Sequence, residues 1–164
     1  MALIKNGELV ESPFVDVSGA SEIPVAGSVI VSLEQWQAQR TALLARGTPL
    51  GIRLRSDQSP ELVAAELPHF ALVALEFPKF RDGRAYSYAR LLRERYGFKG
   101  ELRAVGDVLL EQLLFMLRTG FDAFELTSDD PLRDYRIALA DFSVWYQPAA
   151  DGRPTAMQLR HRKG

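Results

Sequence analysis

The chain has 164 residues, of which 47% are hydrophobic and 25% are charged, and its formal net charge is −1. This length suits a single domain, residues 1–164, with a sizeable core, and is too short for two domains of ordinary size. The near-neutral charge argues against nucleic acid as the main partner. No run approaches 18 apolar residues and the N-terminus has no signal-like apolar run, so we expect no membrane insertion, no export and a cytoplasmic location.

The sequence contains no cysteine. Its absence excludes disulfides, thiolate nucleophiles, and iron–sulfur clusters, haem or zinc held by cysteine. The two histidines, His69 and His161, are too few for a histidine metal cluster. We therefore expect no metal site, and structural or solvated roles for both histidines.

The pattern of apolar residues and turn signals divides the chain into three parts. Residues 1–27 are predicted to form an N-terminal hairpin around Asn6-Gly7, followed by a connection. Residues 28–142 alternate between strand and helix, and Ser59-Pro60 marks one helix start. The strands are expected at 28–33, 50–54, 70–77, 101–105 and 121–126, with helices at 34–46, from 60, 84–96, 108–119 and 131–142.

Five β-α units in residues 28–142 are too few for a closed eight-stranded barrel. We therefore predict an α/β fold with a mostly parallel sheet flanked by helices, and a half-barrel-like β/α arrangement as the alternative. Residues 143–164 are predicted to form a C-terminal hairpin or an exchanged arm, "SVWYQ" and "TAMQLR" around Asp151-Gly152, with a basic tail.

The segment from residue 79 to residue 103 is locally basic. Arg84 lies in the first turn of a predicted helix, where unpaired backbone N–H groups favour an anion, and either a ligand or Asp82 could offset its charge. We predict a small-anion site formed by Lys79 and Arg84, with Tyr86 and Ser87 positioning the ligand. The segment holds eight basic residues (Lys79, Arg81, Arg84, Arg90, Arg93, Arg95, Lys99, Arg103) and three acidic ones (Asp82, Glu94, Glu101).

Two carboxylates near the ends of predicted strands are candidates for catalysis. Asp82 or Asp107 could serve as a general acid or base beside a bound anion. Asp107 could instead cap the helix that follows it, and the sequence favours that alternative.

Helical periodicity separates a predicted buried stripe of the 84–96 helix from its polar face. Arg90 and Arg93 fall on the polar face, so we expect them to point outward, toward solvent or a protein partner. Phe115 lies on a second apolar side of the 108–119 helix, which a partner contact or a homodimer would explain, as would a helix packed under the C-terminal hairpin. The stripe comprises Ala85, Tyr88, Ala89, Leu92 and Tyr96.

No glycine fingerprint for a dinucleotide or a phosphate loop is present. The sequence therefore indicates no cofactor, although flavin or NAD(P) could bind without such a motif.

The stretches "FPKFRDGRAYSYARLLRERYGFKGELRAVGDVLLEQ" and "RTGFDAFEL" resemble the signature region of a bacterial family known as domain of unknown function 934. Members are commonly labelled oxidoreductases of sulfite reduction, so the resemblance implies a place in assimilatory sulfite reduction. One hypothesis is an accessory protein that docks on sulfite reductase or its electron donor. The other is a small α/β enzyme, an oxidoreductase by resemblance only, acting on an anionic sulfur or phosphorylated metabolite.

Overall fold

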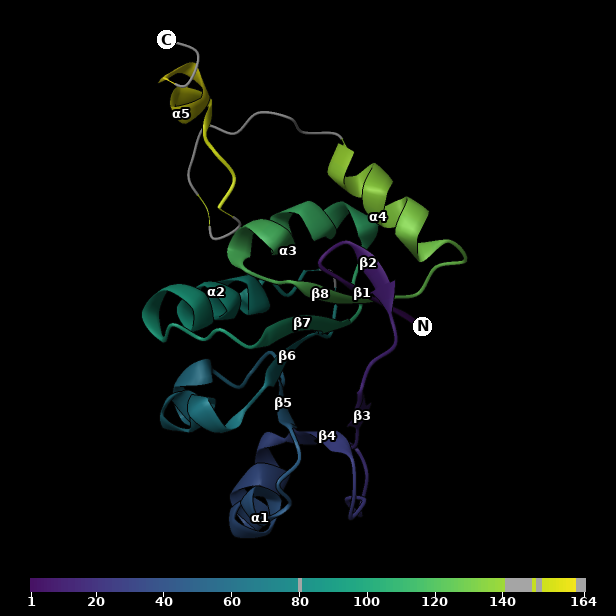
Figure 1. Cartoon of the computed structure of the whole chain (residues 1–164), viewed down its shortest axis with the longest axis vertical. Coiled ribbons are helices and arrows are strands. Elements are labelled where there is room, and N and C mark those ends of the chain that lie inside the picture. The colour runs from purple at the N-terminus through teal and green to yellow at the C-terminus, as the bar shows by residue number, and fades with distance from the viewer. Residues whose placement is uncertain (80, 141–148, 150–151, 162–164) are drawn as a thin grey trace.

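The computed structural model describes residues 1–79, 81–140, 149 and 152–161, which contain one eight-stranded sheet and several helices (Figure 1). The strand order is β2-β1-β8-β7-β6-β5-β4-β3. The strands are β1 (Ala2–Lys5), β2 (Glu8–Val10), β3 (Phe14–Asp16), β4 (Ser28–Ser32), β5 (Leu50–Leu54), β6 (Leu72–Phe77), β7 (Glu101–Gly106) and β8 (Ala123–Leu126). The helices are α1 (Leu33–Ala45), η1 (Pro60–His69), α2 (Arg84–Arg90), η2 (Leu91–Arg95), η3 (Leu110–Gln112), α3 (Leu113–Thr119), α4 (Pro131–Ala140) and α5 (Ala156–His161).

Strands β3 to β8 pair in parallel in their order along the chain, whereas β1 is antiparallel to both β8 and β2. Crossover connections between parallel strands are almost always right-handed, so connections that step repeatedly in one direction place their helices on one face. Figure 1 shows α1, α2 and α3 on one side of the sheet, and the segment from β2 to β3 on the other. The fold is therefore mixed α/β.

The two edge strands, β2 and β3, are separated in sequence by three residues, 11–13. The path between the α-carbons of Val10 and Phe14 is at most about 15 Å. In a flat sheet, seven strand spacings would hold these edges about 33 Å apart. The sheet must therefore curl, and the half-barrel that the sequence offers as the alternative fits this arrangement. We call residues 8–16, which join the two edges, the strap.

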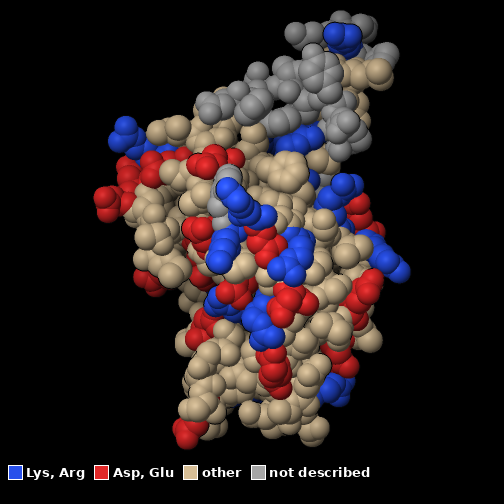
Figure 2. All heavy atoms as spheres, turned by 180° about the vertical axis from the view of Figure 1, so that it is seen from behind, with Lys and Arg blue, Asp and Glu red and all other residues tan. Residues whose placement is uncertain are grey.

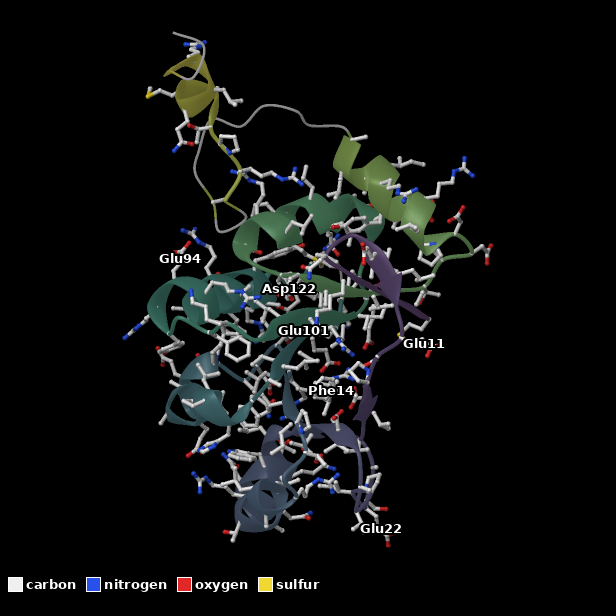
Figure 3. The ribbon with its side chains drawn as sticks, in the orientation of Figure 1. Glu11, Phe14, Glu22, Glu94, Glu101 and Asp122 are labelled. Carbon is white, nitrogen blue, oxygen red and sulfur yellow. The ribbon has the colours of Figure 1, made fainter. Side chains whose placement is uncertain are left out.

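The core lies on both faces of the curled sheet. The outer face carries the larger cluster, in which Ile52, Leu75 and Phe124 are buried beneath the helices. The inner face carries a smaller cluster, to which Phe14 of the strap adds a partly buried ring (Figure 3). That cluster comprises Ile30, Leu72, Ala74 and Val105. The apolar run of β6 is thus explained by two covered faces.

Most predicted elements are confirmed to within a few residues, including the N-terminal hairpin, whose turn residues Asn6 and Gly7 have φ of 52° and 85°. The predicted C-terminal hairpin is wrong in its second arm, because residues 156–161 form α5. Thr155 and Gln158 cap that helix reciprocally, through Thr155 N–H to Gln158 Oε1 at 2.8 Å and Gln158 N–H to Thr155 Oγ1 at 3.3 Å. The first arm, "SVWYQ", lies outside the described residues. No helix in the described part is long and apolar enough to cross a membrane.

A buried ion network lies on the inner face of the sheet. Arg103 of β7 is 1% exposed, and its Nε donates to Glu101 Oε1 at 2.7 Å. Its Nη1 donates to Glu125 Oε1 of β8 at 3.2 Å and to Ser12 Oγ of the strap at 3.1 Å. Lys5 of β1 approaches Glu101 Oε2 at 2.8 Å. The network therefore ties three strands and the strap together.

Replacing Arg103 with methionine should lower the free energy of unfolding by about 3 kcal/mol, because the buried carboxylate of Glu101 and the partly buried carboxylate of Glu125 lose a charged partner. Arg95→Met is the matched control, since Arg95 lies 3.9 Å from Glu61 in a largely exposed pair and such pairs contribute ~0–1 kcal/mol. Urea unfolding measures both. Equal losses for the two variants would contradict the structural role of the network.

Candidate functional site

The carboxyl ends of β3 to β6 open into a cavity of about 530 Å³ at the inner face. Ligands of β/α barrels bind at this end of the strands, so this position makes the cavity the first candidate site. We call it the mouth cavity. It is lined by Asp16, Ser18, Gly19, Ser32, Glu34, Arg53, Arg55, Gln58 and Glu76.

Arg53 of β5 lies between two carboxylates in the mouth cavity. Its Nη1 donates to Asp16 Oδ2 of the strap at 2.8 Å, and its Nη2 lies 3.3 Å from Glu76 Oε1 of β6. Burial alone would raise the pKa of Asp16, but hydrogen bonds from Ser18 and Arg53 outweigh it and lower that pKa below its usual value. Asp16 is therefore ionised at neutral pH.

Arg55 forms a second, more exposed ion pair on the same side of the cavity. Its Nη1 donates to Glu34 Oε1 at 2.8 Å, and its Nε donates to Asp57 Oδ1 at 3.3 Å. Gln58 Nε2 also donates to Glu34 Oε1, at 2.9 Å. Glu34 lies in the first turn of α1, where its own backbone N–H, and then Arg55, lower the pKa of its carboxyl.

The mouth cavity thus presents charges of both signs in an alternating arrangement. Its lining holds three carboxylates and two guanidinium groups, a net charge of −1. Within the described residues, no group of three or more His, Asp or Glu side chains is arranged to hold a metal ion. Polar recognition is the chemistry that this arrangement can perform.

The sequence carried a signal for the mouth cavity that the predictions did not use. Arg53 and Glu76 each stand between two apolar residues of an otherwise apolar strand, and successive side chains of a strand point to opposite faces, so each charge falls on the face opposite to its apolar neighbours. Asp16 could not be found in this way, because β3 has three residues and its only partner is β4, which begins twelve residues later.

The predicted anion site at Arg84 is occupied by a neighbouring side chain. Arg84 Nε and Nη2 donate to the two oxygens of Asp82, at 3.0 and 2.6 Å, and Nη2 also donates to Ser56 Oγ at 3.1 Å. The pKa of Asp82 lies far below its usual value because of Arg84. An incoming anion would have to displace Asp82, so the anion role of Arg84 and the catalytic role of Asp82 stay predictions.

Lys79 and Asp107 are exposed near the same edge of the sheet. The backbone N–H of Asp107 donates to Phe77 O at 2.7 Å. The expectation that Asp107 caps the following helix is wrong, because that helix begins after Leu109. A catalytic role for Asp107 and an anion contact for Lys79 stay predictions.

Four of the predicted site residues, Tyr86, Ser87, Arg90 and Phe115, gather in a groove between α2 and α3 with a volume of about 420 Å³. We call it the α2–α3 groove. The rings of Tyr86 and Phe115 meet edge to face, with centroids 4.8 Å apart. Burial raises the pKa of Tyr86, so its hydroxyl stays protonated at neutral pH. The sequence assigned these residues to separate anion and partner sites, and the fold brings them together.

Arg93 does not point outward, and that expectation is wrong. Its side chain is 17% exposed and donates to the carbonyl oxygens of Phe98, Gly100 and Gly120 at 2.8 to 2.9 Å. Its Nη2 donates to Asp122 Oδ2 at 3.0 Å. Burial raises the pKa of Asp122, although its bonds to Leu102 and Arg93 act in the other direction. Arg93 therefore links η2, which continues α2, to the turns that precede β7 and β8.

Five of the eight basic residues in the segment are paired with a carboxylate. Figure 2 shows Lys and Arg side chains interleaved with Asp and Glu on the face that it presents, without a large region of one sign. The segment therefore offers individual charged contacts and does not form an extended basic surface for anions. Its ion pairs are Arg84–Asp82, Arg90–Glu94, Arg93–Asp122, Arg95–Glu61 and Arg103–Glu101.

A family model described as "Bacterial protein of unknown function (DUF934)" matches residues 51–157, well over half of the chain. The chain belongs to the DUF934 family. The search of curated proteins found no match. In this DUF934 protein, the matched span holds the α2–α3 groove and Arg53, Arg55, Gln58 and Glu76 of the mouth cavity, whereas the strap and Glu34 precede it.

In the DUF934 protein, Asp82→Asn should lower the melting temperature at pH 7, because it removes the charged partner of Arg84. The pKa of Asp82 is lower in the folded chain than in the unfolded chain. Its stabilising contribution is therefore complete above about pH 5 and is lost as the pH falls below about 4. The difference between the two proteins should shrink accordingly in thermal melts from pH 7 to about pH 2.

The control is Asp107→Asn, because Asp107 is exposed and its carboxylate has no partner within the described residues. The Asp107→Asn protein should have the same melting temperature as the parent at every pH. An Asp82→Asn protein as stable as the parent at pH 7 would show that the Arg84 pair contributes nothing.

Proposed function

We propose that this DUF934 protein is an accessory protein of assimilatory sulfite reduction, which docks on sulfite reductase or on its electron donor through the α2–α3 groove. The pathway rests on the resemblance of residues 77–112 and 118–126 to a family labelled in that way. The observation that carries the docking role is the exposed ring of Phe115 beside Tyr86.

Phe115 supports a protein contact because it is large, apolar and 56% exposed, yet held in place. It packs edge to face on Tyr86, whose ring in turn meets Phe77 with centroids 5.2 Å apart. A ring held by a partly buried neighbour loses little conformational entropy on binding. Aromatic side chains with nearby arginines are the residues that most often dominate the energetics of an interface.

Arg90 supports the same role on the polar side of the groove. It pairs with Glu94 at 3.4 Å, and both side chains are exposed. A pair of this kind is weak, so either partner can exchange its contact for a charged group on another protein. Such an exchange of ion pairs would orient the partner on the docking surface and speed up association.

Phe115→Ala should weaken binding to sulfite reductase or its electron donor at least tenfold, as expected for an aromatic anchor in an interface. Ile137→Ala is the matched control, because Ile137 on α4 is 54% exposed and does not line the groove. Biolayer interferometry with the host's two purified proteins measures both variants. Equal losses for both variants, or no binding by the parent at low salt, would overturn the proposal.

Arg90→Ala should slow association at low salt and leave the dissociation rate nearly unchanged, because an exposed charge acts mainly on encounter. Raising the salt concentration should remove the difference from the parent, since exposed charges are screened. A salt-independent loss would assign Arg90 a different role. Arg95→Ala serves as the control, because Arg95 is exposed and lies outside the groove.

A further inference from the structure

We propose that the mouth cavity binds a small zwitterion of the α-amino-acid class, with the ligand's carboxylate at Arg55 and its ammonium group at Glu76 and Asp16. This is a second site on the molecule, and it is independent of the docking role of the α2–α3 groove. The two sites share no lining residue.

The cavity brings fixed groups of both signs within the reach of one small molecule. Arg53 is held from two sides, by Asp16 at 2.8 Å and Glu76 at 3.3 Å, so it stays in place and leaves carboxylate oxygens available at the wall. Arg55 is 52% exposed and is held mainly by Glu34, so its guanidinium can turn to a ligand. An ammonium group and a carboxylate joined by one carbon can contact both regions at once.

The balance of charge argues against a simple anion or a simple cation. A lone anion would face three carboxylates, and a lone cation would face two arginines. Each would therefore meet charges of its own sign that face the same space, and like charges at short range repel each other. A zwitterion offers each set an opposite charge, and hydrogen bonds between charged groups are the stronger kind.

The cavity is also of suitable size and position. Its volume of about 530 Å³ is within the usual range for metabolite sites and exceeds what an amino-acid backbone fills, so a ligand side chain can be accommodated. Ser18 and Gly19 follow the strap at the rim, where they add polar groups beside Asp16. The ligand would therefore contact the strap and three strand ends together.

Titration of the ¹⁵N-labelled protein with three probes tests the proposal. L-serine carries both charges, glycolate lacks the ammonium group, and ethanolamine lacks the carboxylate. We expect saturable shifts at the Arg53, Arg55 and Gly19 amides with L-serine, and an affinity for glycolate or ethanolamine at least tenfold lower than that for L-serine. Glycolate or ethanolamine binding as tightly as L-serine, or no saturable shift with any probe, would overturn the proposal.

Two variants localise the binding. Arg55→Met and Glu76→Gln should each weaken L-serine binding at least tenfold, because each removes one charged contact. Arg95→Met and Glu61→Gln are matched controls from an exposed pair on another part of the surface, and should bind as the parent does. Amide spectra that keep their dispersion show that each variant is folded. Unchanged affinity in both mouth-cavity variants would overturn the assignment.

Discussion

The short link between the two edges of the sheet is the constraint on which the rest of the structure depends. Three residues join β2 to β3, although these strands lie at opposite ends of an eight-stranded order. A chain this short cannot bridge a flat sheet, so the sheet curls until its edges approach. The curl separates an outer face covered by helices from an inner face crossed by the strap (Figure 1).

The polar character of the inner face follows from this closure. Parallel sheets are usually apolar on both faces, yet here β5, β6 and β7 turn Arg53, Glu76 and Arg103 inward. The strap supplies partners for two of these strands, since Ser12 contacts Arg103 and Asp16 contacts Arg53. The same segment that closes the sheet therefore completes the buried network and forms one wall of the mouth cavity.

Local signals predicted the elements well and their long-range contacts poorly. Asn6-Gly7 specifies its turn from within, and Ser59-Pro60 starts its helix in the same way, so both could be read from the sequence. Arg93 could not, because two of its partners, Asp122 and Gly120, lie more than 25 residues away in sequence. The α2–α3 groove was found only in parts for the same reason: Tyr86 and Phe115 meet through the packing of two helices.

Closure by the strap can be measured directly in solution by nuclear Overhauser effects between backbone protons. A curled sheet closed by the strap should give contacts between Leu9 and Ile4, across β2 and β1, together with contacts between Val15 and Val29, across β3 and β4, in the same sample. Both sets can coexist only in a curled sheet, because the link is too short for any other arrangement. Contacts across β1 and β2 without contacts across β3 and β4 would mean an open sheet, and would contradict the closed inner face and the mouth cavity.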